Sequence, residues 1–364
     1  MILNDLKLKN YRSYAEEVFE FGPGVNIIVG PNASGKTNLL ESILTLCTGS
    51  SYRVKDMDLI AFDQPWARIE SSTSDGTRVL TIEQVSVDPP TTKKKFVVNG
   101  ANYARLSLQK AVPVVVFEPE HLRLLHGGPT GRRDYLDNLL EQTTPGYSTI
   151  RRDYRRTVAQ RNALLKRMIN PDDGQLFAWN VRLSQLGGKI VEARSALVTR
   201  LNIELEDLYR QLSHTESTVN LTYVSDAEPN NYSSEVLKLL SRNVEKDSVR
   251  GFTGNGPHRH DFEIVLNGHP AALAASRGET RTLLLALKIL ELRIIEAVRD
   301  KKPILLLDDV FSELDGARRK ALTLFLESYQ TFITTTDADI VVQHFMDNCT
   351  ILPIQKTTSR PTVG

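Results

Sequence analysis

A glycine-rich segment near the start of the chain constrains its fold more than any other feature. It reads Gly30-Pro31-Asn32-Ala33-Ser34-Gly35-Lys36-Thr37. The apolar run Val25–Val29 precedes it, and apolar residues at helical spacing follow as far as Leu46. A strand, a loop and a helix in this order gather backbone N–H groups and a helix N-terminus around one anion. The segment therefore predicts a triphosphate site, where Lys36 contacts the phosphates and Thr37 holds Mg²⁺.

A second acidic element follows the dense apolar run Ile304–Leu307, which predicts a buried strand. Asp308 and Asp309 come directly after it. Because open α/β sheets bind ligands at the carboxyl ends of their strands, we expect Asp308 to bind Mg²⁺. Asp309 is expected to point to the other side of the strand and to polarise the attacking water. Lys36, Asp308 and Asp309 are the predicted catalytic residues.

A third element, Ser276-Arg277-Gly278-Glu279, precedes a long helical pattern that ends at Arg299. A serine hydroxyl, a glycine N–H and a helix N-terminus together form an anion-binding site. The same residues also fit an ordinary helix N-cap. Both interpretations stay open at this level.

The composition limits the class of protein. A formal net charge of +1 means that contact with nucleic acid must come from a local basic patch. Cys47 and Cys349 are too few and too isolated for a disulfide framework, which fits the reducing cytoplasm. The chain begins without a signal-peptide pattern and contains no apolar stretch near ~20 residues, so a soluble cytoplasmic protein without membrane contact is expected.

The organisation along the chain predicts an α/β fold with a largely parallel sheet, because strand and helix patterns alternate. Hairpin turns are expected at Asp75-Gly76, Asn99-Gly100 and Asn267-Gly268. Further strands are predicted at Val112–Phe117, Val219–Tyr223, Phe262–Leu266 and Thr331–Thr334, with a helix near Ala317–Ser328. A frayed tail is expected over Lys356–Gly364.

A charged helical region runs from about Gly131 to Leu212, with breaks at Pro145-Gly146 and Pro171–Gly174. Its apolar residues form a heptad-like stripe: Leu183, Leu186, Ile190, Leu197, Leu201, Leu205, Leu208 and Leu212. This pattern fits either an antiparallel coiled-coil hairpin or a helical subdomain with an ordinary core. We expect residues 1–125 and 251–364 to form the two parts of one domain and residues 126–250 to form a helical insertion.

The densest basic segment is Arg151, Arg152, Arg155 and Arg156, followed by Arg161, Lys166 and Arg167. On a helix these residues could bind DNA phosphates, and Lys93–Lys95 forms a second cluster. The alternative is a solvated charged face. Contacts with phosphates would select DNA by its structure and not by its sequence.

These motifs together resemble ABC-type ATPase heads of the SMC-like DNA-repair branch, with a mainly helical insertion. Ser276–Glu279 is similar to the ABC signature, Leu307–Asp315 to a Walker B strand with its D-loop, and Thr335 stands at the switch position. The match narrows to the RecF family. It rests on Asn10–Tyr14, Gly30–Leu40, Gly128–Asp137, Gly256–Arg259 and Leu307–Asp315, in family order.

The resemblance implies a homodimer clamped by ATP. Its expected ATP-binding residues are Arg12, Gly30, Pro31, Asn32, Ala33, Ser34, Gly35, Lys36, Thr37, Asn38, Ser276, Gly278 and Glu279. Ser276 and Gly278 would face the phosphates held by the other subunit, with Ser312 and Asp315 at the interface. The closed dimer would bind single-stranded and gapped duplex DNA and, with RecO and RecR, promote loading of RecA. Weak DNA-dependent ATP hydrolysis would reset this switch.

Four residues depart from the family pattern: His260 replaces an acid, Glu279 a glutamine, Asp309 the glutamate of transporter ATPases and Thr335 their histidine. The shorter Asp309 is consistent with slow hydrolysis. No Q-loop glutamine can be placed, because Val112–Leu125 contains none. The alternatives are another ABC-type subunit and a nucleotide-gated scaffold for partner proteins. The distance of about 240 residues from the phosphate loop to Ser276 argues against a transporter subunit.

Overall fold

A computed structural model describes residues 1–51, 53–87, 90–167, 174–326, 328–337, 341, 345 and 349–355, without the side chains of Leu122, Ser312 and Glu313. The expected break at Pro171–Gly174 lies outside the described residues except for Gly174, and the expected tail Lys356–Gly364 lies wholly outside them. The chain divides into two units, one of Met1–Glu120 with Glu291–Gly364 and one of His121–Leu290. The second unit therefore includes residues 251–290, which we had expected in the first.

The first unit contains a fully parallel sheet of five strands in the order β14-β3-β13-β12-β8. Its strands are β3 (Val25–Val29), β8 (Val114–Phe117), β12 (Ile304–Asp308), β13 (Thr331–Thr335) and β14 (Cys349–Pro353). β12 and β13 are buried along their whole length, as expected for strands covered on both faces. The predicted parallel sheet is confirmed.

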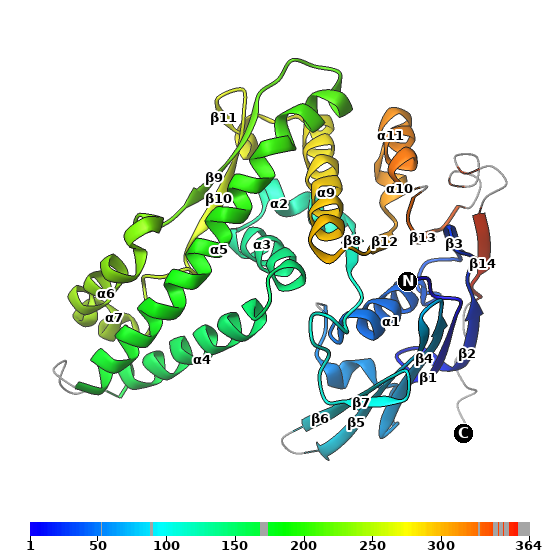
Figure 1. The fold of residues 1–364 in the computed structure, drawn as a ribbon, viewed down its shortest axis with the longest axis horizontal. Helices are drawn as coiled ribbons and strands as arrows, with labels where there is room; N and C mark the ends of the chain where they lie inside the picture. The colour runs from blue at the N-terminus through cyan, green and yellow to red at the C-terminus, as the bar shows by residue number, and fades with distance from the viewer. Residues whose placement is uncertain are drawn as a thin grey trace. The chain divides into compact units, whose positions relative to one another are not determined.

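The first unit also contains an antiparallel sheet of six strands, in the order β2-β1-β4-β5-β6-β7. It comprises β1 (Asp5–Tyr11), β2 (Tyr14–Glu20), β4 (Trp66–Thr73), β5 (Gly76–Val87), β6 (Pro90–Val98) and β7 (Ala101–Tyr103). α1 (Lys36–Thr48) shares one hydrophobic core with both sheets, through residues such as Leu39, Ile43 and Leu46. Two short helices, α10 (Val310–Glu313) and α11 (Gly316–Leu326), follow β12 (Figure 1).

The second unit is mainly helical (Figure 1). Its helices are α2 (Arg123–His126), α3 (Pro129–Thr143), α4 (Tyr147–Leu165), α5 (Gly174–Ser213), α6 (Tyr232–Arg242), α7 (Val244–Arg250) and α8 (Ala271–Ala274), and α9 (Arg277–Arg299) begins in it. α5 packs against α3, α4, α6 and strand β9. Because the apolar stripe of α5 packs against several elements, the structure favours the core of a helical unit over a two-helix coiled coil.

A small antiparallel sheet, β11-β10-β9, completes the second unit with β9 (Val219–Val224), β10 (Asp261–Leu266) and β11 (His269–Pro270). Two buried ion pairs join helices of this unit, α4 to α7 and α5 to α3. Arg161 binds Asp247 at 2.7 Å, and Arg194 binds Asp137 at 2.9 Å. Within the described ranges, no helix has the length and apolarity that a bilayer crossing requires.

Candidate phosphate-binding site

The phosphate loop joins β3 to α1 in the first unit and needs glycine at two positions. Gly35 caps α1 with φ 103°, a backbone conformation that side chains disfavour. A Cβ atom on Gly30 would lie 2.5 Å from the Ile354 carbonyl oxygen. The loop is thus packed closely against the chain that follows β14. This geometry places the N-terminus of α1, with its unpaired N–H groups, at the carboxyl edge of the parallel sheet.

Lys36 begins α1 and is only 9% exposed. Its Nζ donates hydrogen bonds to the carbonyl oxygens of Gly30 at 2.7 Å and Pro31 at 3.0 Å. Burial lowers the pKa of the Lys36 ammonium, while the carboxylates of Asp309 and Asp308 act in the opposite direction. A phosphate group at the loop would supply the negative charge that favours the protonated amine.

The two predicted Mg²⁺ ligands meet across the sheet edge. The Thr37 hydroxyl lies 3.1 and 3.0 Å from the two carboxylate oxygens of Asp308. Asp308 also accepts a hydrogen bond from Thr334 Oγ1 at 2.7 Å. One hydroxyl and one carboxylate suit Mg²⁺, which takes few protein ligands and completes its shell with phosphate oxygens and water. Among the described residues, no group of three or more His, Cys, Asp or Glu side chains is placed to hold a metal.

Asp309 does not follow the strand alternation that we expected. β12 ends at Asp308, and Asp309 adopts φ 53° as the N-cap of α10. Its backbone N–H donates to Thr334 Oγ1 at 3.0 Å. Thr334 therefore joins both acids, whereas Thr335, the predicted switch residue, exchanges hydrogen bonds with the Asp337 backbone. Sequence reasoning missed Thr334 because three consecutive threonines give no sign of which one faces the acids.

Two further residues at this edge were missed. Arg53 NH2 lies 2.5 Å from Glu118 Oε2 and 3.1 Å from Asp308 Oδ2. Glu118 follows β8, which pairs directly with β12, so their carboxyl ends meet. Glu118 directly follows the predicted strand Val112–Phe117, and an acid at a strand end is the sequence signal that indicates it. Nothing in the sequence around Arg53 indicates its role.

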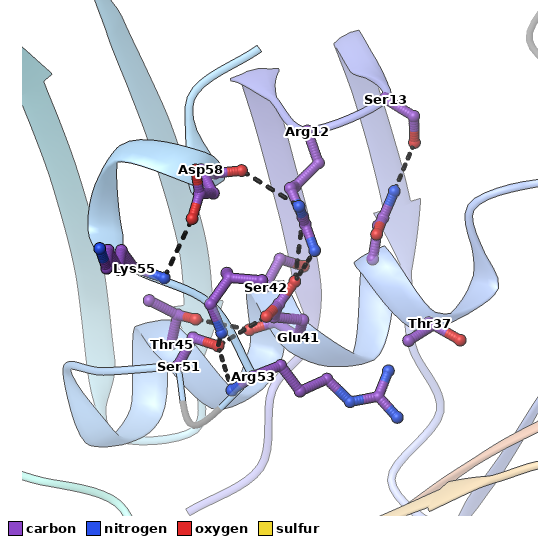
Figure 2. A network of polar contacts seen from close by, with 12 residues as sticks. Arg12, Ser13, Thr37, Glu41, Ser42, Thr45, Ser51, Arg53, Lys55 and Asp58 are labelled. Atoms are coloured by element: carbon purple, nitrogen blue, oxygen red, sulfur yellow. Dashed lines mark hydrogen bonds and ion pairs between the residues drawn. The ribbon is translucent and has the colours of Figure 1, made fainter.

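The turn between β1 and β2 is tied to α1 (Figure 2). Arg12 Nε and NH2 each lie 3.1 Å from Glu41 Oε2, and NH1 donates to the Asp58 carbonyl oxygen at 3.2 Å. Asn38 donates to Ser13 Oγ at 2.9 Å. The predicted nucleotide residues Arg12 and Asn38 thus lie beside the phosphate loop, with Arg12 held by α1 itself.

The signature-like residues lie in the second unit and form a capping box. Ser276 N–H donates to Glu279 Oε2 at 2.8 Å, and Glu279 N–H donates to Ser276 Oγ at 3.3 Å. The hydrogen bond from the Ser276 backbone lowers the pKa of the Glu279 carboxyl group. An anion-binding site and an ordinary helix N-cap are both compatible with this arrangement, because the capped helix end remains exposed at Ser276.

The remaining predicted residues fall into separate places. Asp315 forms an ion pair with Arg318 at the start of α11. The side chain of Ser312 lies outside the described residues.

Arg151 is mostly buried and pairs with Asp134 and Glu141, both at 2.8 Å. The other three predicted DNA-binding arginines are more accessible, with side chains 41% exposed for Arg152 and 65% for Arg155 and with Arg156 also exposed. Arg161 is wholly buried.

The motif Gly128–Asp137 contacts the two residues that directly follow the motif Gly256–Arg259 inside the second unit. Arg132 binds Asp261 in a bidentate pair at 2.7 Å, and Arg133 donates to the His260 carbonyl oxygen at 2.8 Å. His260, which departs from the family pattern, binds Asp226 at 2.6 Å. These pairs give the motifs a shared structural role.

Comparisons with a family model and with individual proteins point to the same family. Residues 2–359 match the model of the RecF/RecN/SMC N terminal domain. The chain is 35% identical over 370 residues to the DNA replication and repair protein RecF of Limosilactobacillus fermentum, covering 98% of both chains. It is 34% identical to RecF of Staphylococcus epidermidis, covering 98% of this chain and 99% of that protein.

Solved structures agree with the sequence comparison. The recombination mediator protein RecF-ATPrS in the RecFOR pathway matches with a TM-score of 0.83 at 29% identity, over 98% of both chains. The RecF-ATP structure matches with a TM-score of 0.81 at 30% identity, over 92% of both chains. An Smc head bound to the C-terminal winged-helix domain of ScpA, at 16% identity and a TM-score of 0.51, shares the fold. The predicted ABC/SMC-like ATPase head is confirmed, and the chain belongs to the RecF family of DNA replication and repair proteins.

Proposed function

We propose that this chain binds ATP and Mg²⁺ at the phosphate loop and uses them to control binding to DNA in recombinational repair. The observation that carries the proposal is the meeting of the Thr37 hydroxyl with the Asp308 carboxylate beside the loop. Lys36 and the loop N–H groups would hold the phosphates, and Thr37 and Asp308 would hold Mg²⁺. Mg²⁺ would neutralise phosphate charge. Asp309 would orient water for slow hydrolysis.

The exposed helix end at Ser276 supports an ATP-dependent homodimer. A capped helix N-terminus favours negative charge, and the γ-phosphate held by a second copy would supply it. Ser276 and Gly278 would make this contact, with Ser312 and Asp315 at the same interface. Glu279 would orient Ser276 through the capping box.

The DNA surface is proposed on α4. Arg152, Arg155 and Arg156 offer charges for phosphates of single-stranded or gapped duplex DNA. Two similar solved structures are named for the RecFOR pathway, which supports RecO and RecR as partners and RecA loading at gaps as the outcome. We place this activity in the cytoplasm, with ATP hydrolysis as the step that releases DNA.

The test measures affinity for gapped DNA with ATP, with ADP and without nucleotide, together with the molecular mass in each state. We expect ATP alone to give a dimer and tight DNA binding. Lys36→Met should abolish ATP binding and both responses, while the exposed Lys7→Met should change neither. Equal DNA affinity in all three nucleotide states would contradict the switch and favour a scaffold for partner proteins.

A further inference from the structure

A cleft of about 150 Å³ lies in the first unit, away from the phosphate loop. Residues 109–113, which precede β8, line it together with Lys301 and Lys302, which precede β12. It therefore lies at the amino edge of the parallel sheet, whereas the phosphate loop and Asp308 lie at the carboxyl edge. The volume is roughly ten times the ~10–15 Å³ that one water molecule requires, so a small anion fits.

Arg78 of β5 forms the buried side of this cleft and is only 6% exposed. Its NH2 donates to the Lys110 carbonyl oxygen at 3.0 Å, but its Nε has no hydrogen-bond partner among the described residues. No described carboxylate pairs with this guanidinium. The nearby Cys47 cannot neutralise it, because burial raises the pKa of that thiol to about 12. A buried guanidinium without a counter-ion is costly, so the site favours an anion.

Three lysines complete the lining. Lys110, Lys301 and Lys302 are exposed at the cleft, and none forms an ion pair with a described residue. The Lys302 Nζ donates to the Ser328 carbonyl oxygen at 3.0 Å and lies 5.8 Å from the centre of the Tyr329 ring, so neither contact neutralises its charge. The lining includes one carboxylate, Asp75, on an exposed turn. The positive charges therefore outweigh the negative charge around the cleft.

We propose that this cleft binds a phosphate group, with the Arg78 guanidinium as the buried donor and the three lysines as its outer charges. Guanidinium and ammonium groups that line one cleft suit the oxygens of phosphate. The phosphate could be inorganic or the terminal phosphate of a DNA strand, and these sources share the same chemistry. The site is independent of ATP binding at the loop.

The first test titrates inorganic phosphate into the Lys36→Met protein by calorimetry at constant ionic strength, so that the phosphate loop contributes nothing. We expect binding, and we expect Lys301→Gln/Lys302→Gln to weaken it by about tenfold, the effect of losing charged hydrogen bonds. Lys7→Gln/Lys9→Gln removes the same charge from exposed positions of β1 and should have no effect. No phosphate binding, or equal losses in both variants, would overturn the proposal.

A second variant tests the buried donor. Arg78→Met should lose phosphate binding and, in phosphate-free buffer, keep the melting temperature of the parent protein, since an unpaired buried charge is removed. If Arg78→Met does not fold, phosphate binding by Lys301→Gln/Lys302→Gln and its control still tests the proposal. A 5′-phosphorylated oligonucleotide and its unphosphorylated twin then identify the source. Tighter binding of the former, lost in Lys301→Gln/Lys302→Gln, assigns the site to DNA ends; equal binding assigns it to free phosphate.

Discussion

Arg53 forms an ion pair with Asp308, the predicted metal ligand, with 3.1 Å between NH2 and Oδ2. The same guanidinium binds Glu118 from the neighbouring strand end. A fixed positive charge therefore lies beside the carboxylate that is proposed to hold Mg²⁺. Arg53 and a Mg²⁺ ion at this site would compete for the same oxygens.

We predict that Arg53→Ala lowers the Mg²⁺ concentration needed for half-maximal ATP binding by about three- to tenfold, because a competing charge is removed in a partly screened site. A fluorescent ATP analogue titrated at several Mg²⁺ concentrations measures this. Arg68→Ala, which removes an exposed arginine of β4, is the control. A higher Mg²⁺ requirement would show that Arg53 contacts the nucleotide.

Ser276→Arg should leave ATP binding intact and prevent ATP-dependent dimerisation, because a long cation would replace the small hydroxyl at the proposed interface. Losing the N-cap should also cost about 1 kcal/mol of stability. Light scattering with ATP measures the dimer. Ser276→Thr keeps a capping hydroxyl and should still dimerise. A dimer of the arginine variant at normal ATP affinity would remove Ser276 from the interface.

Neutralising three arginines of α4, Arg152→Gln/Arg155→Gln/Arg156→Gln, should weaken DNA binding. The slope of log affinity against log salt should fall by about 0.9 for each lost contact with duplex phosphate. The matched control is Arg182→Gln/Lys189→Gln/Arg200→Gln, which removes three exposed cations from α5. An unchanged salt slope would place the DNA surface elsewhere.

Arg151→Gln should behave differently from its neighbours. Its guanidinium pairs with Asp134, Asp137 and Glu141 at 2.8 Å each, so the substitution removes one of the two arginines that neutralise the buried Asp137. We expect the free energy of unfolding to fall by about 2–3 kcal/mol. Urea denaturation measures this. A loss of DNA affinity at unchanged stability would contradict a structural role.

The half-buried His258 should make the second unit sensitive to mild acid. Burial, together with the charges of the neighbouring Arg259, His260 and Arg133, lowers the pKa of its imidazole to about 4. Tyr154 OH lies 2.8 Å from Nδ1, and Nε2 donates to the Thr253 carbonyl oxygen at 3.1 Å, an arrangement that fits a neutral ring protonated at Nε2. The unfolded chain, with an ordinary pKa near ~6.5, binds the proton more readily.

Because the folded pKa is the lower one, this contribution to stability is complete above pH ~6.5 and is lost as the pH falls towards 4. From the size of the shift, we expect a loss of roughly 2 kcal/mol by pH 5. Urea denaturation at pH 7 and pH 5 measures the difference. His258→Gln, which cannot take up the proton, should lose less stability over this range. An equal loss in both proteins would assign the acid sensitivity to other groups.

The sequence by itself determined the phosphate loop, the two acids after β12 and the order of strands and helices around them. These features are local: a glycine pattern and an apolar run fix backbone conformation within a few residues. They sufficed for the family and for the expectation that Thr37 and Asp308 meet.

Only the tertiary structure decided which other side chains join them. Thr334, Arg53 and Glu118 come from distant segments, and packing of the parallel strands brings them to Asp308. Packing also decided that Arg151 is buried in ion pairs while Arg155 is exposed, although both belong to one basic run. Side-chain burial depends on contacts between residues far apart in sequence, which no local pattern records.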